Sequence, residues 1–115
     1  MPRNKGGLGA MRVPMLADVS KALSRAYGVL VEDAGDELCG VALRGTVIID
    51  PKGIVRAVSI NDAPVGRSVD EVLRTVQALK HTDMHGEVCP AGWTPGAPTM
   101  IADVKGSKSY FDKVR

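Results

Sequence analysis

The feature of this sequence that most restricts its fold is a pair of short apolar runs separated by a strong turn signal. Residues 46–49 are all β-branched, and residues 54–60 form a second run with strand character. Between them, Pro51 and Gly53 occupy positions that turns favour. We therefore predict a β-hairpin. Because its apolar side chains face both sides, the hairpin is expected to belong to a sheet that is covered on both faces.

The segment that begins at Ser68 has the strongest helical pattern in the chain. Ser68 and Glu71 have the spacing of a capping box, in which the two side chains satisfy backbone N–H groups of the first turn. The apolar residues that follow form one continuous stripe, made of Val69, Val72, Leu73, Val76 and Leu79. We predict a helix from this cap through Lys80.

The N-terminal third is predicted to be less regular. Residues 1–11 are Gly-rich and basic, which indicates a loop. Residues 12–17 have β-compatible side chains around a proline, which predicts a short strand at an edge or an end of a sheet. Asp18 is expected to cap a helix over residues 19–26, which Gly28 would end in a left-handed conformation.

The two cysteines lie in segments predicted to be irregular. Cys39 belongs to an acidic stretch, residues 27–40, which we interpret as a solvated loop. Cys89 follows the predicted helix, and Pro90 and Gly92 prevent the helix from continuing. Its thiol is therefore predicted to be accessible and able to exchange with a disulfide or a sulfenic acid. Without its flanking residues, a single cysteine in a tail would be better interpreted as simply an unpaired residue.

Two histidines near the end of the predicted helix are a possible but incomplete metal site. His81 and His85 are four residues apart, a spacing that can bind a metal, but no third ligand stands nearby in the sequence. Histidines near a helix C-terminus more often interact with the helix dipole. We therefore expect no metal and no cofactor. Further along the tail, residues 108–113 are predicted to form a short helix.

Composition limits the classes of partner. The chain has 115 residues, enough for one domain, and a net charge of +2 without basic runs, which argues against a nucleic-acid or membrane partner. No stretch approaches the roughly 18 consecutive apolar residues of a membrane span, and the N-terminus has no apolar signal region. Two cysteines are poor evidence for a disulfide framework. A cytoplasmic location with reduced thiols is expected.

Several motifs occur in the order in which they stand in typical 2-Cys peroxiredoxins, thioredoxin-dependent peroxidases of the AhpC/TSA family, which the chain resembles. They are Gly6-Gly7-Leu8-Gly9, Tyr27-Gly28-Val29-Leu30, Arg44-Gly45, Ile48-Ile49-Asp50, Asn61-Asp62, Pro64-Val65-Gly66-Arg67-Ser68-Val69-Asp70-Glu71, His85-Gly86-Glu87-Val88-Cys89-Pro90-Ala91-Gly92-Trp93 and Tyr110-Phe111. The segment around Cys89 resembles the one that holds the family's resolving cysteine. The resemblance covers nearly the whole chain, but only the C-terminal half of the family's subunit.

This resemblance implies an α/β, thioredoxin-like (peroxiredoxin) fold that is incomplete, because the N-terminal strands and the helix with the peroxidatic cysteine have no match. It also implies two regions, with residues 1–84 as the C-terminal half of the domain and residues 85–115 as a resolving-cysteine tail. The apolar hairpin would then expose a patch and an unpaired edge. Residues 32–41 are longer than the family's usual connection, and Cys39 has no counterpart there.

Site roles are likewise implied by the resemblance. The family's peroxidatic cysteine stands in a Pro-x-x-x-Thr-x-x-Cys motif, and neither cysteine here has that proline and threonine upstream. Arg44 and Arg67 would lie beside that nucleophile, where a cation favours the thiolate and holds the peroxide oxygens. Otherwise they are arginines of the surface or of a helix entrance. Cys89 would attack the sulfenic acid of a partner subunit, giving an intersubunit disulfide that thioredoxin reduces.

Three functions stay open at this point. The chain could be a truncated peroxiredoxin-type antioxidant protein that contributes its resolving cysteine to the reduction of hydrogen peroxide and organic hydroperoxides within a homo-oligomer. It could instead be a non-catalytic module that pairs with full-length peroxiredoxin subunits and regulates them. Finally, it could be a generic thiol protein in which Cys39 and Cys89 form an internal redox pair. Whether the isolated chain is an enzyme is left open, because the peroxidatic motif is absent.

Overall fold

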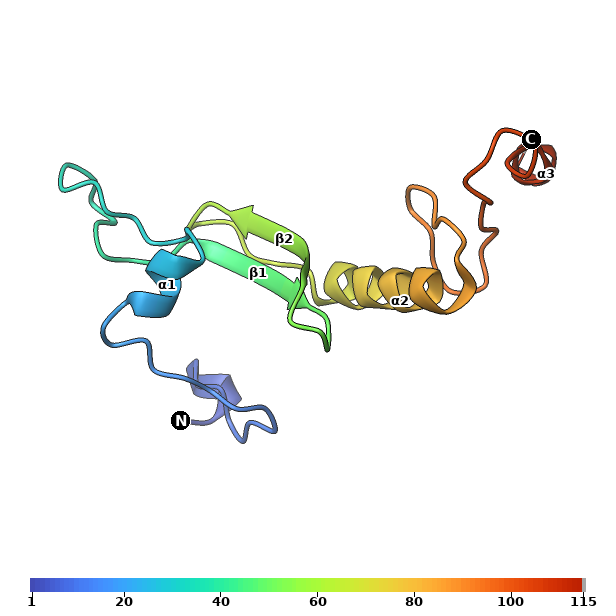
Figure 1. Cartoon of the computed structure of the whole chain (residues 1–115). Coiled ribbons are helices and arrows are strands. Elements are labelled where there is room, and N and C mark those ends of the chain that lie inside the picture. Colours follow the sequence, from blue (N-terminus) through green and yellow to red (C-terminus); the bar gives the residue numbers. More distant parts are fainter. Residues whose placement is uncertain (115) are drawn as a thin grey trace. The chain divides into compact units, whose positions relative to one another are not determined.

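A computed structural model describes residues 1–114. Its elements, in chain order, are η1 (Arg3–Lys5), α1 (Ala22–Ala26), β1 (Arg44–Ile49), β2 (Val55–Asn61), α2 (Val69–His85) and α3 (Lys108–Lys113) (Figure 1). The chain divides into two compact units, Met1–Leu43 and a second one that begins at Arg44. The division predicted between residues 84 and 85 stays a prediction.

The first unit lacks the strand predicted for residues 12–17, and that prediction is wrong. The segment has no regular structure, and its apolar side chains are exposed, with Leu16 at 81%. Within residues 1–114 the only two-stranded sheet is formed elsewhere, so a strand here would have no neighbour to pair with. A proline at its centre removes a further backbone donor. β-Compatible side chains alone therefore do not produce a strand in this segment.

Helix α1 begins later than predicted and has Lys21, not Asp18, at its N-cap position, although the Asp18 side chain bonds N–H groups of the first turn. The Asp18 carboxylate accepts hydrogen bonds from the Leu23 and Ser24 backbone N–H groups at 3.1 and 2.8 Å. Lys21, however, has a left-handed backbone with φ of +60°, so the helix starts only at the next residue. The hydrogen bond from the Ser24 N–H is the largest of the effects that lower the pKa of Asp18. Gly28 is left-handed, with φ of +67°, as predicted.

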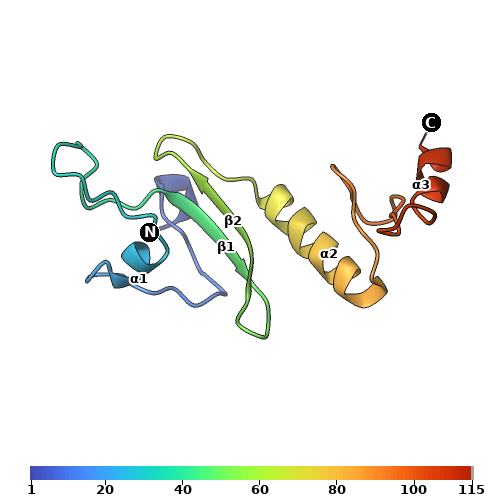
Figure 2. The ribbon, with the colours of Figure 1, turned by 45° about the horizontal axis from the view of Figure 1, so that its top comes forward.

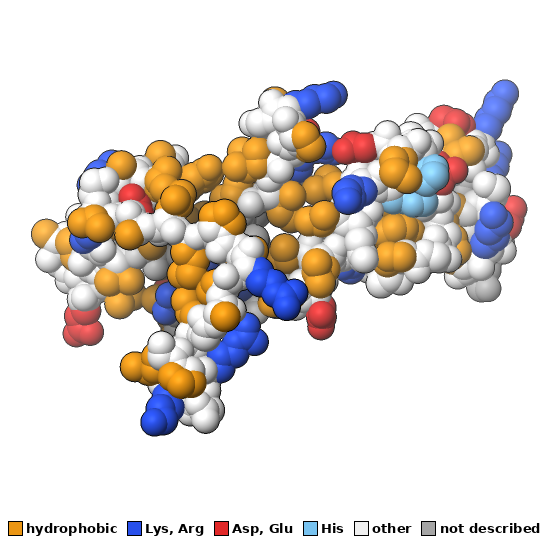
Figure 3. Space-filling model, turned by 90° about the horizontal axis from the view of Figure 1, so that it is seen from below, with side chains coloured by type: hydrophobic (Ala, Val, Ile, Leu, Met, Phe, Trp, Pro, Cys, Tyr) orange, Lys and Arg blue, Asp and Glu red, His pale blue; other side chains and the backbone are white. Residues whose placement is uncertain are grey.

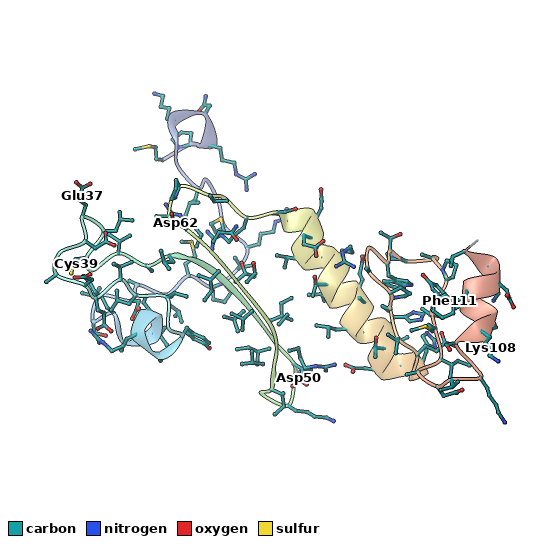
Figure 4. The ribbon with its side chains drawn as sticks, turned by 90° about the horizontal axis from the view of Figure 1, so that it is seen from above. Glu37, Cys39, Asp50, Asp62, Lys108 and Phe111 are labelled. Carbon is teal, nitrogen blue, oxygen red and sulfur yellow. The ribbon has the colours of Figure 1, made fainter. Side chains whose placement is uncertain are left out.

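The acidic stretch after α1 is an exposed loop, as predicted. An isolated antiparallel bridge between Leu30 and Ala42 closes it at its base. The Asp33 and Asp36 side chains accept hydrogen bonds from backbone N–H groups two residues on, which gives the loop its tight turns. Cys39 is exposed on this loop, close to Glu37 (Figure 4).

Strands β1 and β2 form the predicted antiparallel hairpin (Figure 2). Asp50 organises the turn, because its side chain accepts hydrogen bonds from the Lys52 and Ile54 N–H groups at 2.9 and 3.0 Å. Gly53 closes the turn with φ of +81°, a conformation that other residues rarely adopt. The local turn chemistry therefore explains the hairpin register.

Neither face of the hairpin is fully covered within the described residues, so the predicted two-sided burial is not reached there. Ile49, Val58 and Ile60 are 45%, 54% and 44% exposed, and no strand residue is buried. The hairpin is also the whole sheet of residues 1–114, so the outer edges of both strands are unpaired. Hydrophobic side chains are spread over the surface seen in Figure 3. Such a surface and such edges are association-prone.

At a β-bulge in the hairpin, the side chain of Arg56 reaches helix α2. The register shifts between Ile48 and Ile49, so that Arg56 has no partner on β1. Its guanidinium donates two hydrogen bonds to the Asp83 carboxylate, at 2.9 and 3.0 Å, and one to Asp50 at 3.3 Å. These bonds tie the hairpin to the last turns of α2.

This tie is expected to weaken in acid. The Arg56 hydrogen bonds lower the pKa of Asp83 below its ordinary 3.8, despite the opposing effect of desolvation. A carboxylate with a lowered folded-state pKa stabilises the fold above its unfolded-state value, and this contribution disappears as the pH falls through the folded-state value. Urea unfolding of the wild type and Asp83→Asn, followed by circular dichroism, should therefore differ at neutral pH and converge in strong acid. A difference that is independent of pH would contradict the expectation.

Helix α2 is capped as predicted but runs five residues beyond Lys80. The Ser68 side chain accepts a hydrogen bond from the Glu71 N–H at 3.2 Å, which is half of the predicted capping box. The Glu71 carboxylate pairs with Arg74 instead. The helix ends at Gly86, whose left-handed φ of +68° allows its N–H to bond the Thr82 carbonyl.

The described C-terminal part agrees with the sequence, because α3 spans the predicted residues 108–113. Lys108 and Phe111 lie on this helix (Figure 4). Among residues 1–114, no helix has the length and apolar character needed to cross a membrane.

Candidate functional site

The segment after α2 closes into a loop around the chain's only tryptophan. We call residues 87–100 the cysteine loop. An antiparallel bridge between Val88 and Met100 joins its ends, with N–H to carbonyl distances of 2.7 and 3.0 Å. Inside it, the Trp93 indole donates a hydrogen bond to the Ala97 carbonyl at 3.0 Å. Trp93 is only 4% exposed, one of two buried hydrophobic residues among those described.

Cys89 lies in this loop with its thiol against α2. Its Sγ atom is 3.7 Å from the Ala78 carbonyl oxygen, to which the thiol donates, and 3.7 Å from the Thr82 hydroxyl oxygen. The hydroxyl itself donates to the same carbonyl at 3.0 Å. Cys89 is free and half-buried, whereas the free Cys39 is exposed. The predicted accessible thiol is therefore partly shielded by the helix.

Arg74 connects the cysteine loop to the first turns of α2. Its guanidinium donates one hydrogen bond to the Trp93 carbonyl at 2.9 Å and two to the Glu71 carboxylate, both at 2.8 Å. These Glu71 bonds are the main cause that raises the pKa of Arg74, and a Cys89 thiolate adds a smaller attraction in the same direction. A permanent cation therefore stands on the same helix face as the thiol.

The two histidines pack beside the same loop. The His81 ring lies 4.3 Å from the His85 ring and 5.0 Å from the Trp93 ring, measured between centroids. The His81 Nε2 atom is buried without a hydrogen bond, 3.8 Å from the Glu87 carboxylate. Among residues 1–114, no three metal-ligating side chains gather into a potential site.

Glu87 anchors the start of the cysteine loop to its end. Its carboxylate accepts a hydrogen bond from the Thr99 hydroxyl. That bond is the largest cause lowering the pKa of Glu87, and His81 and His85 act in the same direction against the effect of burial. The carboxylate therefore stays charged at neutral pH and can attract either imidazole when it is protonated.

Arg44 and Arg67 lie together at the open end of the hairpin. Arg44 is the first residue of β1, and its Nε donates to the Ala63 carbonyl at 3.0 Å. Arg67 precedes α2, and its guanidinium donates to the Gly45 carbonyl at 3.0 Å. Both side chains are exposed. Two cations are thus held by backbone carbonyls beside the start of one strand.

A cavity of about 430 Å³ opens between the hairpin and the first turns of α2. Its polar lining includes Thr46, Ser59, Asn61, Arg67 and Glu71. Cys89 is not part of this lining and contacts the second half of α2 instead. Of the three predicted site residues, Arg67 therefore lines this cavity, whereas Arg44 is not part of the lining and Cys89 lies at a different part of the helix.

Sequence reasoning missed Arg74 and Thr82 as neighbours of the thiol. The spacing of Glu71 and Arg74, three residues apart on a predicted helix, indicates that they pair. Arg74, Ala78 and Thr82 also follow each other at intervals of four, which places them on one helix face. What spacing could not reveal is that the loop folds back onto this face, because that depends on the buried Trp93.

Two family models match the chain. Residues 3–58 match the AhpC/TSA family, and residues 78–113 match the C-terminal domain of 1-Cys peroxiredoxin. Peroxiredoxin-2 of Bos taurus is 59% identical over 112 residues, which are 97% of this chain and 54% of that protein. Peroxiredoxin-4 of Homo sapiens is 56% identical over 113 residues, which are 98% of this chain and 40% of that protein.

A solved structure is likewise similar to this chain over about half of its own length. The reduced 2-Cys peroxiredoxin of Plasmodium vivax superposes with a TM-score of 0.87 at 38% sequence identity, over 97% of this chain and 55% of that one. The predicted α/β, thioredoxin-like fold is therefore confirmed. The chain spans about half the length of the relatives that it matches.

Proposed function

Because this chain belongs to the peroxiredoxin family of AhpC/TSA proteins, we propose that it supplies a resolving thiol, Cys89, to thioredoxin-dependent reduction of peroxides. The observation that carries the proposal is the cysteine loop. A free, half-buried thiol is held against α2 by a small loop with a matched family segment around it. The 115 residues contain no Pro-x-x-x-Thr-x-x-Cys motif, so the first nucleophile lies outside them, and we propose that a partner subunit supplies it.

The proposed chemistry has three steps, and Cys89 takes part in the second and the third. A partner's peroxidatic thiolate attacks a peroxide oxygen, is oxidised to sulfenic acid and releases water or an alcohol. The Cys89 thiolate then attacks the sulfenic sulfur, a sulfur–sulfur bond forms, and the sulfenic oxygen leaves as water. Thioredoxin's dithiol reduces this disulfide by thiol–disulfide exchange, which regenerates both thiols and leaves thioredoxin oxidised.

For Arg44 and Arg67 we propose a role toward the partner's thiol. Both are exposed cations at the open end of the hairpin and donate to backbone carbonyls. A cation beside a thiol favours the thiolate, which is the nucleophilic form. Arg44 and Arg67 lie at a different part of this unit from Cys89. This agrees with the proposed order of steps, in which the partner's peroxidatic sulfur and the Cys89 sulfur start apart and meet only after the first has been oxidised.

The exposed hairpin favours a second candidate function, a non-catalytic module that pairs with full-length peroxiredoxin subunits. Val58 and Ile60 are about half exposed, and the sheet of the described residues ends after two strands. A chain that supplies further strands would cover this surface and pair its edges. Either candidate has a peroxiredoxin subunit as partner, and the two differ in whether Cys89 reacts. We propose the cytoplasm, where thiols stay reduced, as the location of both.

Disulfide trapping separates the two candidates. The purified chain is mixed with a 2-Cys peroxiredoxin subunit whose own resolving cysteine has been replaced by serine, and hydrogen peroxide is then added. We expect a disulfide-linked heterodimer on a non-reducing gel, because the partner lacks its own resolving cysteine and Cys89 takes over that role. The band should disappear with dithiothreitol.

Two matched variants serve as controls. Cys89→Ser should give no heterodimer, whereas Cys39→Ser should give as much as the wild type. Co-purification without a disulfide would support the pairing module instead. If neither a disulfide nor co-purification is observed, both candidates are refuted.

A further inference from the structure

We propose that Arg74 is a positioning residue for Cys89: its hydrogen bond to the Trp93 carbonyl holds the cysteine loop against α2 and keeps the thiol shielded until that bond breaks. The inference deepens the proposed function and rests on it for its biological meaning. Its physical content, the accessibility of one thiol, can be measured on the isolated chain.

The connection from Arg74 to the thiol is short. The Trp93 N–H donates to the Pro90 carbonyl at 3.0 Å, which makes residues 90–93 a closed turn directly after Cys89. Whatever holds the end of this turn therefore also fixes its start. Arg74 holds the end, through its 2.9 Å bond to the Trp93 carbonyl.

Arg74 itself is held firmly in place by Glu71. Glu71 accepts two hydrogen bonds from the guanidinium, a paired geometry that lysine cannot reproduce. The remaining Nη1 hydrogen bond is then aimed at the Trp93 carbonyl. The side chain is about 29% exposed, so water competes with this bond only in part.

The contacts between the cysteine loop and α2 that remain without Arg74 are weak. Cys89 touches α2 through two sulfur contacts of 3.7 Å, to Ala78 and Thr82. Sulfur hydrogen bonds are weak, so they do not hold a loop by themselves. Trp93 also packs on the His81 ring, at 5.0 Å between centroids, and the Glu87 carboxylate lies 3.8 Å from the His81 Nε2 atom without a hydrogen bond. A charge-assisted bond is therefore the strongest polar link between loop and helix.

A positioning role and an electrostatic role predict opposite results. If Arg74 mainly attracted the Cys89 thiolate, its removal would slow the reactions of that thiol, and lysine would restore them. If Arg74 holds the loop closed, its removal exposes the thiol and speeds its reactions, and lysine does not restore the shielding. The contacts favour the second outcome, since Arg74 donates its hydrogen bond to the loop backbone, at the Trp93 carbonyl.

The test compares the wild type, Arg74→Gln, Arg74→Lys and Lys80→Gln. Lys80 is an exposed cation of the same helix, so its replacement changes the charge equally without touching the loop. Alkylation of Cys89 and Cys39 by iodoacetamide is followed in one sample by mass spectrometry. The exposed Cys39 serves as the internal reference. Emission of Trp93, the only tryptophan, reports whether the loop stays closed.

For Arg74→Gln and Arg74→Lys we expect Cys89 alkylation to be about tenfold faster, the factor that loss of one charge-assisted hydrogen bond produces in an opening equilibrium. The ratio to the wild type should be the same from neutral to alkaline pH, because opening precedes ionisation. Trp93 emission should shift to longer wavelength. Cys39 alkylation, and both rates in Lys80→Gln, should equal those of the wild type.

Glu71→Gln provides a second variant in case Arg74→Gln does not fold. It leaves Arg74 in place but weakens the pair that orients it, so an acceleration between those of the wild type and Arg74→Gln is expected. Slower alkylation in Arg74→Gln that Arg74→Lys restores would overturn the proposal in favour of an electrostatic role. Unchanged rates and unchanged emission in all Arg74 and Glu71 variants would also overturn it. Neither result depends on whether disulfide trapping with a peroxiredoxin subunit succeeds.

Discussion

Replacing Cys89 with serine is expected to abolish all peroxide turnover that this chain supports. In a coupled assay with thioredoxin, thioredoxin reductase and NADPH, the wild-type chain is added to a peroxiredoxin subunit that lacks its own resolving cysteine. NADPH consumption should rise with the amount of chain, because each cycle needs one disulfide between the subunit and Cys89. The serine variant should leave the rate at that of the subunit alone.

The same assay gives its own controls. Cys39→Ser should match the wild type, because Cys39 lies on an exposed acidic loop of the first unit. The chain without any subunit should consume peroxide no faster than an equal concentration of a simple thiol. Rapid turnover by the isolated chain, lost on replacing either cysteine, would identify a nucleophile within these residues and contradict the proposed function.

Trp93→Ala is expected to have the largest effect on stability of any single substitution in the second unit. Its side chain is 4% exposed and fills the cysteine loop, which has no other buried residue. Truncating a buried tryptophan costs about 3–5 kcal/mol. The bridge between Val88 and Met100 should open, so hydrogen exchange of these two amides should be at least about a hundredfold faster.

Trp93→Phe separates packing from hydrogen bonding. Phenylalanine keeps most of the apolar volume but loses the indole N–H that donates to the Ala97 carbonyl. Loss of such a bond costs about 1 kcal/mol, so exchange should be only several-fold faster. Equal exchange in Trp93→Ala and the wild type would mean that the loop is held by its backbone bridge alone.

Local sequence signals were sufficient wherever neighbouring residues determine the structure. Asp50 and Gly53 specify the hairpin turn through contacts within four residues, and Ser68 caps α2 through one bond to Glu71. Gly28 was likewise predicted as left-handed from its place after a helix. In each case the deciding interaction spans a single turn, so residue type and spacing determine it.

Predictions from the sequence were wrong or incomplete where contacts between distant residues, or the absence of such contacts, determine the structure. Residues 12–17 have strand-like side chains, but no second strand in the described residues pairs with them. Lys21 adopts a left-handed backbone that no preference of lysine indicates, which delays α1. In the site, the Cys89 segment was recognised from its neighbours, whereas Arg74 was missed because its contact with Trp93 joins residues nineteen positions apart.

The hairpin has a consequence for the order in which the protein forms. All contacts between β1 and β2 are closed by a single tight turn, and α2 is likewise built from contacts a few residues apart. Hairpins and helices of this kind form within microseconds, because closing a short loop costs little chain entropy. Both elements can therefore form on the ribosome as soon as they emerge. A partner chain would then dock onto preformed elements, and its association rate would be limited by encounter and not by folding of this chain.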